Sequence, residues 1–188
     1  IVATDLSPGM IEIAVARQGG SGRVEWQTAD AMALPFADSS FDLVVCQFGV
    51  MLFPDRVAAY REVKRVLKPG GTFLFAAWDS LGANELPLAV TEAINAIFPD
   101  DPILFLERVP YGYFDHERIR GDLAAAGFGG IFIETVPLEG TAASAWHAAA
   151  AHCQGTPLRG ELEQRAPGRL DDMTAKVAAA LAARFGEG

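Results

Sequence analysis

Short apolar runs alternate with helix-like segments over the first eighty residues, and this alternation restricts the fold more than any other feature of the sequence. Ser7 and Pro8 are suited to begin a helix after the first run, and Pro54 with Asp55 is suited to begin another. Strands alternating with helices are typical of a parallel sheet covered by helices. We therefore predict an α/β, Rossmann-like, doubly wound fold with helices on both faces of a mainly parallel sheet, with strands near 1–5, 23–28, 41–47 and 71–78.

The rest of the chain predicts mainly helices and continues the same domain. A further strand is expected near 131–137, and helices are expected at 85–98, from Asp115 to Gly127, at 142–153 and at 171–185. The first helix should reach about Gln18 and end in the turn Gly19–Gly22. We predict a single, partial domain over 1–188, in which 1–79 form the cofactor-binding core and 80–188 supply the substrate or lid region and the C-terminal helices.

The charge balance argues against two classes of partner, nucleic acids and anionic membranes. The 188 residues carry a net charge of -9, whereas nucleic acids and anionic membrane surfaces attract basic patches. No apolar stretch has the length of a membrane span, and no signal peptide is recognisable. The two cysteines form no disulfide framework and the three histidines lack metal-ligand spacing. We predict a cytoplasmic protein that binds neither nucleic acid nor membrane and holds no metal.

Distinctive residues follow the predicted strands at the edge where doubly wound folds bind ligands. Asp5 could accept hydrogen bonds from both hydroxyls of a ribose. Asp30 could accept from an exocyclic amine, while the backbone N–H of Ala31 meets a ring nitrogen. Together these residues predict an adenosine site. The alternative is that both carboxylates cap the turns after their strands or lie on a loop surface.

Three blocks of this sequence resemble the class I S-adenosylmethionine-dependent methyltransferases of the small-molecule type. They are "VATDLSPGMIEIA", "WQTADAMALPFADSSFDLVVCQFGVMLF" and "AAYREVKRVLKPGGTFLFAAWD". The resemblance implies S-adenosyl-L-methionine as cofactor, with Asp5 on the ribose and Leu6 against the adenine. It places Asp30 and Ala31 on the adenine edge. The other cofactor contacts it implies are Met10, Cys46, Gln47 and Phe48.

Apolar side chains after the strands are candidates for contact with a small-molecule methyl acceptor. The candidates are Met51, Phe53, Trp78, Tyr111 and Tyr113, and the alternative for all of them is packing in the core or beneath a long loop. The family transfers the methyl group by direct displacement, so positioning does much of the work and no enzyme nucleophile is required. We name no catalytic residue.

The sequence departs from the family at its beginning. The family's first strand and glycine-rich loop would precede Ile1, and that strand would lie between the strands at Ile1 and Phe41. We expect the folded protein to retain upstream residues, to borrow a strand from a second copy in a homodimer, or to pair these two strands directly. Two other functions stay open: a truncated or degenerate binding module without catalysis, and an NAD-dependent oxidoreductase.

Overall fold

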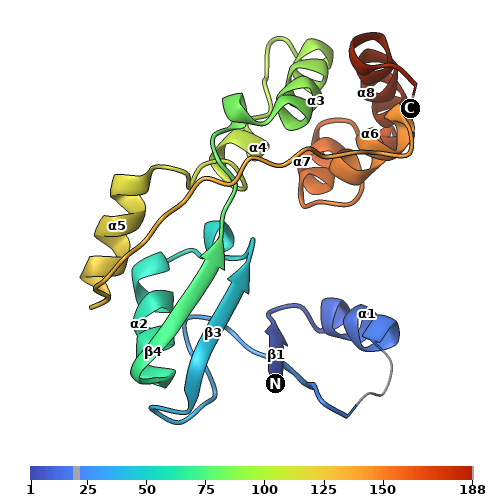
Figure 1. Cartoon of the computed structure of the whole chain (residues 1–188). Coiled ribbons are helices and arrows are strands. Elements are labelled where there is room, and N and C mark those ends of the chain that lie inside the picture. The colour runs from blue at the N-terminus through green and yellow to red at the C-terminus, as the bar shows by residue number, and fades with distance from the viewer. Residues whose placement is uncertain (19–21, 188) are drawn as a thin grey trace. The chain divides into compact units, whose positions relative to one another are not determined.

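A computed structural model describes residues 1–18 and 22–187, and the chain forms two compact units within it (Figure 1). The first unit comprises Ile1–Ala76 and His116–Phe132. The second comprises Ala77–Asp115 and Ile133–Gly188. All four strands belong to the first unit, and the second unit is helical in its described residues.

The strands form two parallel pairs. Strand β1 (Val2–Asp5) pairs with β2 (Glu25–Thr28), and β3 (Phe41–Gln47) pairs with β4 (Leu67–Ala76). The second pair has an irregularity in its register between Phe41 and Leu43. Strands of like direction separated by helices are the pattern that the sequence predicts, and the α/β, Rossmann-like class is confirmed.

Direct pairing between the strands at Ile1 and Phe41, one of the three expected arrangements, is wrong. Within the described residues, β1 pairs only with β2 and β3 only with β4. On one face of the β3–β4 pair, Leu43, Val45 and Leu74 each expose more than half of their surface.

In the first unit, one helix packs against β4 to build the core, and a second helix packs on the first. Helix α2 (Arg56–Val66) begins at Asp55, whose carboxylate accepts a hydrogen bond from the N–H of Ala58 at 2.9 Å. Tyr60 of α2 is fully buried and its ring lies 5.6 Å and 5.8 Å from the rings of Phe73 and Phe75. Helix α5 (His116–Ala125) packs on α2. One face of the β3–β4 pair is thus covered by α2.

Helix α1 (Pro8–Gln18) lies against β1 and β2 and begins where Ser7 and Pro8 predict it. None of its residues is buried. Of the turn predicted after it, residues 19–21 lie outside the described residues.

The second unit is a helical cluster with its own apolar core. The predicted helices at 85–98, 142–153 and 171–185 are found as α3 (Glu85–Ile97), α6 (Ala145–Cys153) and α8 (Leu170–Phe185). Two further helices, α4 (Phe105–Arg108) and α7 (Leu158–Arg165), were not predicted from the sequence. Two short 3-10 turns complete the structure, η1 (Val50–Leu52) in the first unit and η2 (Leu81–Ala83) in the second.

The strand predicted near 131–137 is wrong. This stretch is neither strand nor helix, and Phe132 and Val136 are 81% and 63% exposed. Its β-branched composition favours a strand, but a strand also requires a hydrogen-bonded neighbour. No strand edge in the described part of the chain pairs with it.

Candidate functional site

Asp5 stands at the carboxyl end of β1 and holds the turn into α1. Its Oδ1 accepts a hydrogen bond from the N–H of Ser7 at 2.7 Å, and Ser7 Oγ accepts from the N–H of Met10 at 3.4 Å. The Asp5 side chain is exposed, and its Oδ2 accepts no hydrogen bond from the described residues. Because an ionised carboxylate has about four acceptor positions, this turn leaves most of its capacity for a ligand.

Asp30 repeats this arrangement beyond the end of β2. Its Oδ1 accepts from the N–H of Met32 at 2.8 Å, and its backbone C=O accepts from the N–H of Ala33 at 3.0 Å. The N–H of Ala31 between them donates to no group in the described part of the chain. The turn therefore presents a carboxylate oxygen and a backbone donor side by side.

The parallel register brings these two turns to the same edge. Asp5 lies opposite Thr28, and the backbone C=O of Asp5 accepts from the N–H of Ala29 at 3.1 Å. Asp30 follows directly after Ala29. Both carboxylates also cap local turns, as the alternative interpretation expected, so the capping role and the ligand-binding role are compatible here. The donor and acceptor set fits an adenosine group.

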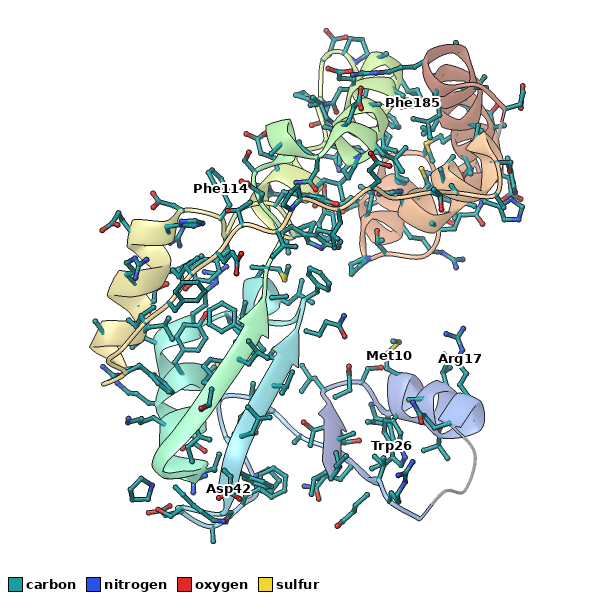
Figure 2. The ribbon with its side chains drawn as sticks, viewed as in Figure 1. Met10, Arg17, Trp26, Asp42, Phe114 and Phe185 are labelled. Carbon is teal, nitrogen blue, oxygen red and sulfur yellow. The ribbon has the colours of Figure 1, made fainter. Side chains whose placement is uncertain are left out.

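Leu6 and Met10 flank this edge with apolar surface. Leu6 is 69% exposed and Met10 is 54% exposed. Figure 2 shows Met10 at the end of α1 that adjoins β1. These side chains are available to cover the faces of a bound base or ribose.

The end of β3 carries the second group of predicted cofactor contacts. The backbone N–H groups of Gly49 and Val50 donate to the Cys46 thiol, and burial raises the pKa of that thiol. A Cβ on Gly49 would lie 2.8 Å from Cys46 Sγ, so only glycine fits this turn without displacement. Phe48 adopts a φ of 53°, which is unusual for a residue with a side chain, and its N–H donates to Ala76 C=O at 3.1 Å. The chain thus reverses tightly just after β3.

A shallow apolar hollow of about 270 Å³ lies at the carboxyl ends of β3 and β4. It places Cys46 and Gln47 beside residues of the neighbouring strand. Its lining is Val45, Cys46, Gln47, Leu74, Phe75 and Ala76.

The side chains predicted to contact the methyl acceptor divide into buried and accessible ones. Met51 and Tyr113 are buried, and Tyr111 is 7% exposed, with burial raising its pKa to about 12. Burial favours the packing alternative for these three. Phe53 is half-buried, and Trp78 is 38% exposed and lies 5.9 Å, ring to ring, from Tyr111.

Two residues that the sequence analysis missed hold the loop after Asp30. Glu62 and Arg65 of α2 bind the backbone of that loop on both sides of Leu34. An acidic and a basic residue three positions apart on a helix are too common a pattern to reveal this role.

In the ranges 1–18 and 22–187, no group of three or more His, Cys, Asp or Glu side chains could hold a metal ion. No helix there is long and apolar enough to cross a membrane.

Comparison with known proteins identifies the first 75 residues. Residues 1–75 match the family described as Methyltransferase domain. An uncharacterized protein of Mycobacterium tuberculosis (strain ATCC 25618 / H37Rv) is 42% identical over 83 residues, which are 44% of this chain and 30% of that protein. The demethylmenaquinone methyltransferase of Clavibacter sepedonicus is 41% identical over 80 residues, 43% of this chain and 33% of that enzyme. The matched part of the chain thus spans about a third of these relatives.

Solved structures agree in fold. A SAM-dependent methyltransferase of Thermotoga maritima superposes with a TM-score of 0.50 at 24% identity, over 67% of this chain and 54% of that one. The [4+2]-cyclase SpnF superposes with a TM-score of 0.52 at 22% identity, over 99% of this chain and 61% of that one. Over residues 1–75, the chain is thus similar to the methyltransferase domain family.

Proposed function

We propose that the edge formed by Asp5 and Asp30 binds the adenosine part of S-adenosylmethionine, in a protein that methylates a small, apolar molecule. The observation that carries this proposal is the parallel register of β1 and β2, which brings both carboxylates and the Ala31 N–H to one edge. Carboxylate acceptors beside a backbone donor are the groups that an adenosine requires.

Each residue of the edge has a binding task in this proposal. Asp5 accepts from the ribose hydroxyls, using Oδ2 and the remaining capacity of Oδ1. Asp30 accepts from the adenine amine while the Ala31 N–H donates to a ring nitrogen, and Leu6 with Met10 covers the base. When bound, the cofactor supplies an electrophilic methyl group on a sulfonium sulfur, which an acceptor atom displaces in line.

The hollow at the ends of β3 and β4 is the proposed place for the remainder of the cofactor. Cys46 and Gln47 line this hollow, and the resemblance to the methyltransferases implies that these two residues and Phe48 contact the cofactor. The raised pKa keeps the Cys46 thiol protonated near neutral pH, so it serves as an apolar wall rather than a nucleophile.

A small, apolar acceptor is supported by charge and by accessible side chains. A net charge of -9 disfavours a nucleic-acid acceptor, and Phe53 and Trp78 offer accessible aromatic surface. One relative, from Clavibacter sepedonicus, is named for a reaction on demethylmenaquinone, which is itself a small molecule. A cytoplasmic location and a homodimer remain part of the proposal.

Calorimetry tests the proposal against the two other functions. The complete protein is titrated with S-adenosylhomocysteine and, separately, with NAD. We expect binding of S-adenosylhomocysteine and none of NAD; the reverse preference would establish an oxidoreductase site. Binding of S-adenosylhomocysteine without transfer of a labelled methyl group from S-adenosylmethionine to any of a panel of small acceptors, quinols included, would favour the non-catalytic module.

A further inference from the structure

Arg65 uses all of its donors to hold the loop that follows Asp30. The guanidinium has five N–H groups. Nη2 donates to Leu34 C=O at 2.9 Å, and Nη1 donates to Phe36 C=O at 2.7 Å and to Asp38 Oδ1 at 2.8 Å. Nε and Nη2 both donate to Glu62, at 2.8 Å each. Five donors therefore meet five acceptors, three of which belong to the loop.

Glu62 binds the other backbone group of Leu34, its N–H. Its Oε2 accepts from the N–H of Leu34 at 2.9 Å, while Arg65 binds the C=O of the same residue. The hydrogen bonds from Arg65 are the main cause that lowers the pKa of the Glu62 carboxyl. Both backbone groups of Leu34 are thus bound by one charged pair on α2.

The far end of the loop is fixed to the same helix. Ser39 and Ser40 donate their N–H groups to the C=O groups of Arg65 and Val66, at 2.9 Å and 2.8 Å. These carbonyls belong to the last turn of α2, where no intrahelical donor is available. The loop is therefore tied to α2 at Leu34 and again at Ser39 and Ser40.

Leu34 follows directly after the hydrogen-bonded turn that begins at Asp30. Ala33, the residue before Leu34, donates its N–H to the C=O of Asp30 at 3.0 Å, and Met32 donates to the Asp30 carboxylate at 2.8 Å. A shift of Leu34 would therefore move the acceptor and donor that face the ligand. Because binding groups must be held close to their productive geometry, small shifts there are costly.

We infer that Glu62 and Arg65 are positioning residues that set the Asp30 turn so that it recognises the amino group of the adenine. This inference rests on the proposed function, since it concerns how the same site selects its cofactor. The pair touches no cofactor atom in this scheme; it acts through Leu34 and the Asp30 turn. An arginine is needed because its planar fork of donors matches acceptors in several directions, which a lysine ammonium cannot do.

A ratio of two affinities separates positioning from general stabilisation. The complete protein and its variants are titrated with S-adenosylhomocysteine and with S-inosylhomocysteine, in which a carbonyl oxygen replaces the adenine amine. We expect the wild-type protein to prefer the adenine compound. Arg65→Lys should lower this preference by about tenfold, within the ~100-fold that misplaced binding groups can cost.

Glu62→Gln provides a milder second variant if Arg65→Lys does not fold. It keeps an oxygen for the Leu34 N–H but loses the charge that pairs with Arg65, so a smaller loss of preference is expected. Arg165→Lys is the matched control. Arg165 also binds two carboxylates, those of Asp101 at 2.7 Å and Glu161 at 3.3 Å, but in the second unit.

The outcomes are distinct. An unchanged ratio in both variants, with both affinities reduced equally or not at all, would overturn the inference and leave the pair a structural clamp. An equal change of the ratio in Arg165→Lys would also overturn it. Failure of the wild-type protein to bind either compound would overturn the proposed function itself, and the inference with it.

Discussion

Replacing Asp5 by asparagine removes the proposed ribose contact while preserving the turn. The asparagine side-chain oxygen can take the place of Oδ1 and accept from the Ser7 N–H, now at 2.7 Å from the carboxylate. Its NH₂ group replaces Oδ2, so an acceptor for a ribose hydroxyl is lost along with the charge. A hydrogen bond to a charged group contributes about 1.5–3 kcal/mol. Because Asp5 is exposed, we take the lower end, and about 1.4 kcal/mol corresponds to a tenfold loss of affinity.

The assay is calorimetric titration of the complete protein with S-adenosylhomocysteine, with thermal unfolding recorded alongside. Asp42→Asn is the control, since Asp42 is also an exposed aspartate on a strand. It stands near the amino end of β3, away from the carboxyl end that carries Cys46 and Gln47 (Figure 2), and both of its oxygens lie 2.9 Å from Lys68 Nζ. We expect Asp42→Asn to leave the affinity unchanged. If Asp5→Asn retains the affinity, with an unchanged unfolding temperature, the proposed contact of Asp5 with the ribose would be refuted. Asp5 would then serve only to stabilise the turn into α1.

Three further outcomes are expected. Asp30→Asn should weaken S-adenosylhomocysteine binding less than Asp5→Asn does, because Asp30 is proposed to accept one hydrogen bond, from the adenine amine, whereas Asp5 is proposed to accept two, from the ribose hydroxyls; an equal or larger loss by calorimetry would contradict the assigned contact. Gly49→Ala should lower the free energy of unfolding by about 1–3 kcal/mol, because the new Cβ would overpack against Cys46 Sγ. The Gly49 φ of -105° suits alanine, so no backbone strain adds to this loss. Adding Cys46→Ala should restore the stability in a denaturant titration, and no rescue would argue against this contact. Burial raises the pKa of Cys153 from 9.0 to about 11, so the unfolded thiol ionises first and the stability should fall by about 2 kcal/mol as the pH rises from 9 to 11. Cys153→Ala should remove that part of the decline in unfolding experiments, and an identical decline in both proteins would refute it.

The sequence predicts those elements whose signals are local. The helix after Ser7 begins as expected because serine and proline favour a helix start, and α2 begins after Asp55 for the same reason. The four strands near the start were predicted from short runs that contain β-branched and apolar residues, most densely at 41–46, and all four are found. The approximate positions of Asp5 and Asp30 at strand ends followed from these boundaries.

The errors arise where structure depends on distant partners. The stretch near 131–137 has strand composition, but whether it forms a strand depends on an available edge, which composition does not reveal. Helix α7 has few apolar residues, and only Leu158 and Leu162 are buried, so its pattern was too weak to recognise. Tyr113 was a candidate contact for the methyl acceptor, with packing beneath a long loop as the alternative, and it is fully buried.

Of the proposed site, only the residues that would face the ligand were predictable from the sequence. Asp5 and Asp30 were recognised because strand ends are where doubly wound folds bind ligands. The contacts that hold the Asp30 turn join residues about thirty positions apart, as between Leu34 and Arg65, and no local pattern indicates them. Only the folded structure shows that α2 supports the loop.

A crystal structure of the complete protein with S-adenosylhomocysteine tests the central claim most directly. We expect the ribose hydroxyls within hydrogen-bonding distance of the Asp5 carboxylate, and the adenine amine within hydrogen-bonding distance of the Asp30 carboxylate. The N–H of Ala31 should point at a ring nitrogen of the adenine. An adenosine bound elsewhere, with Asp5 and Asp30 still engaged only in their own turns, would contradict it.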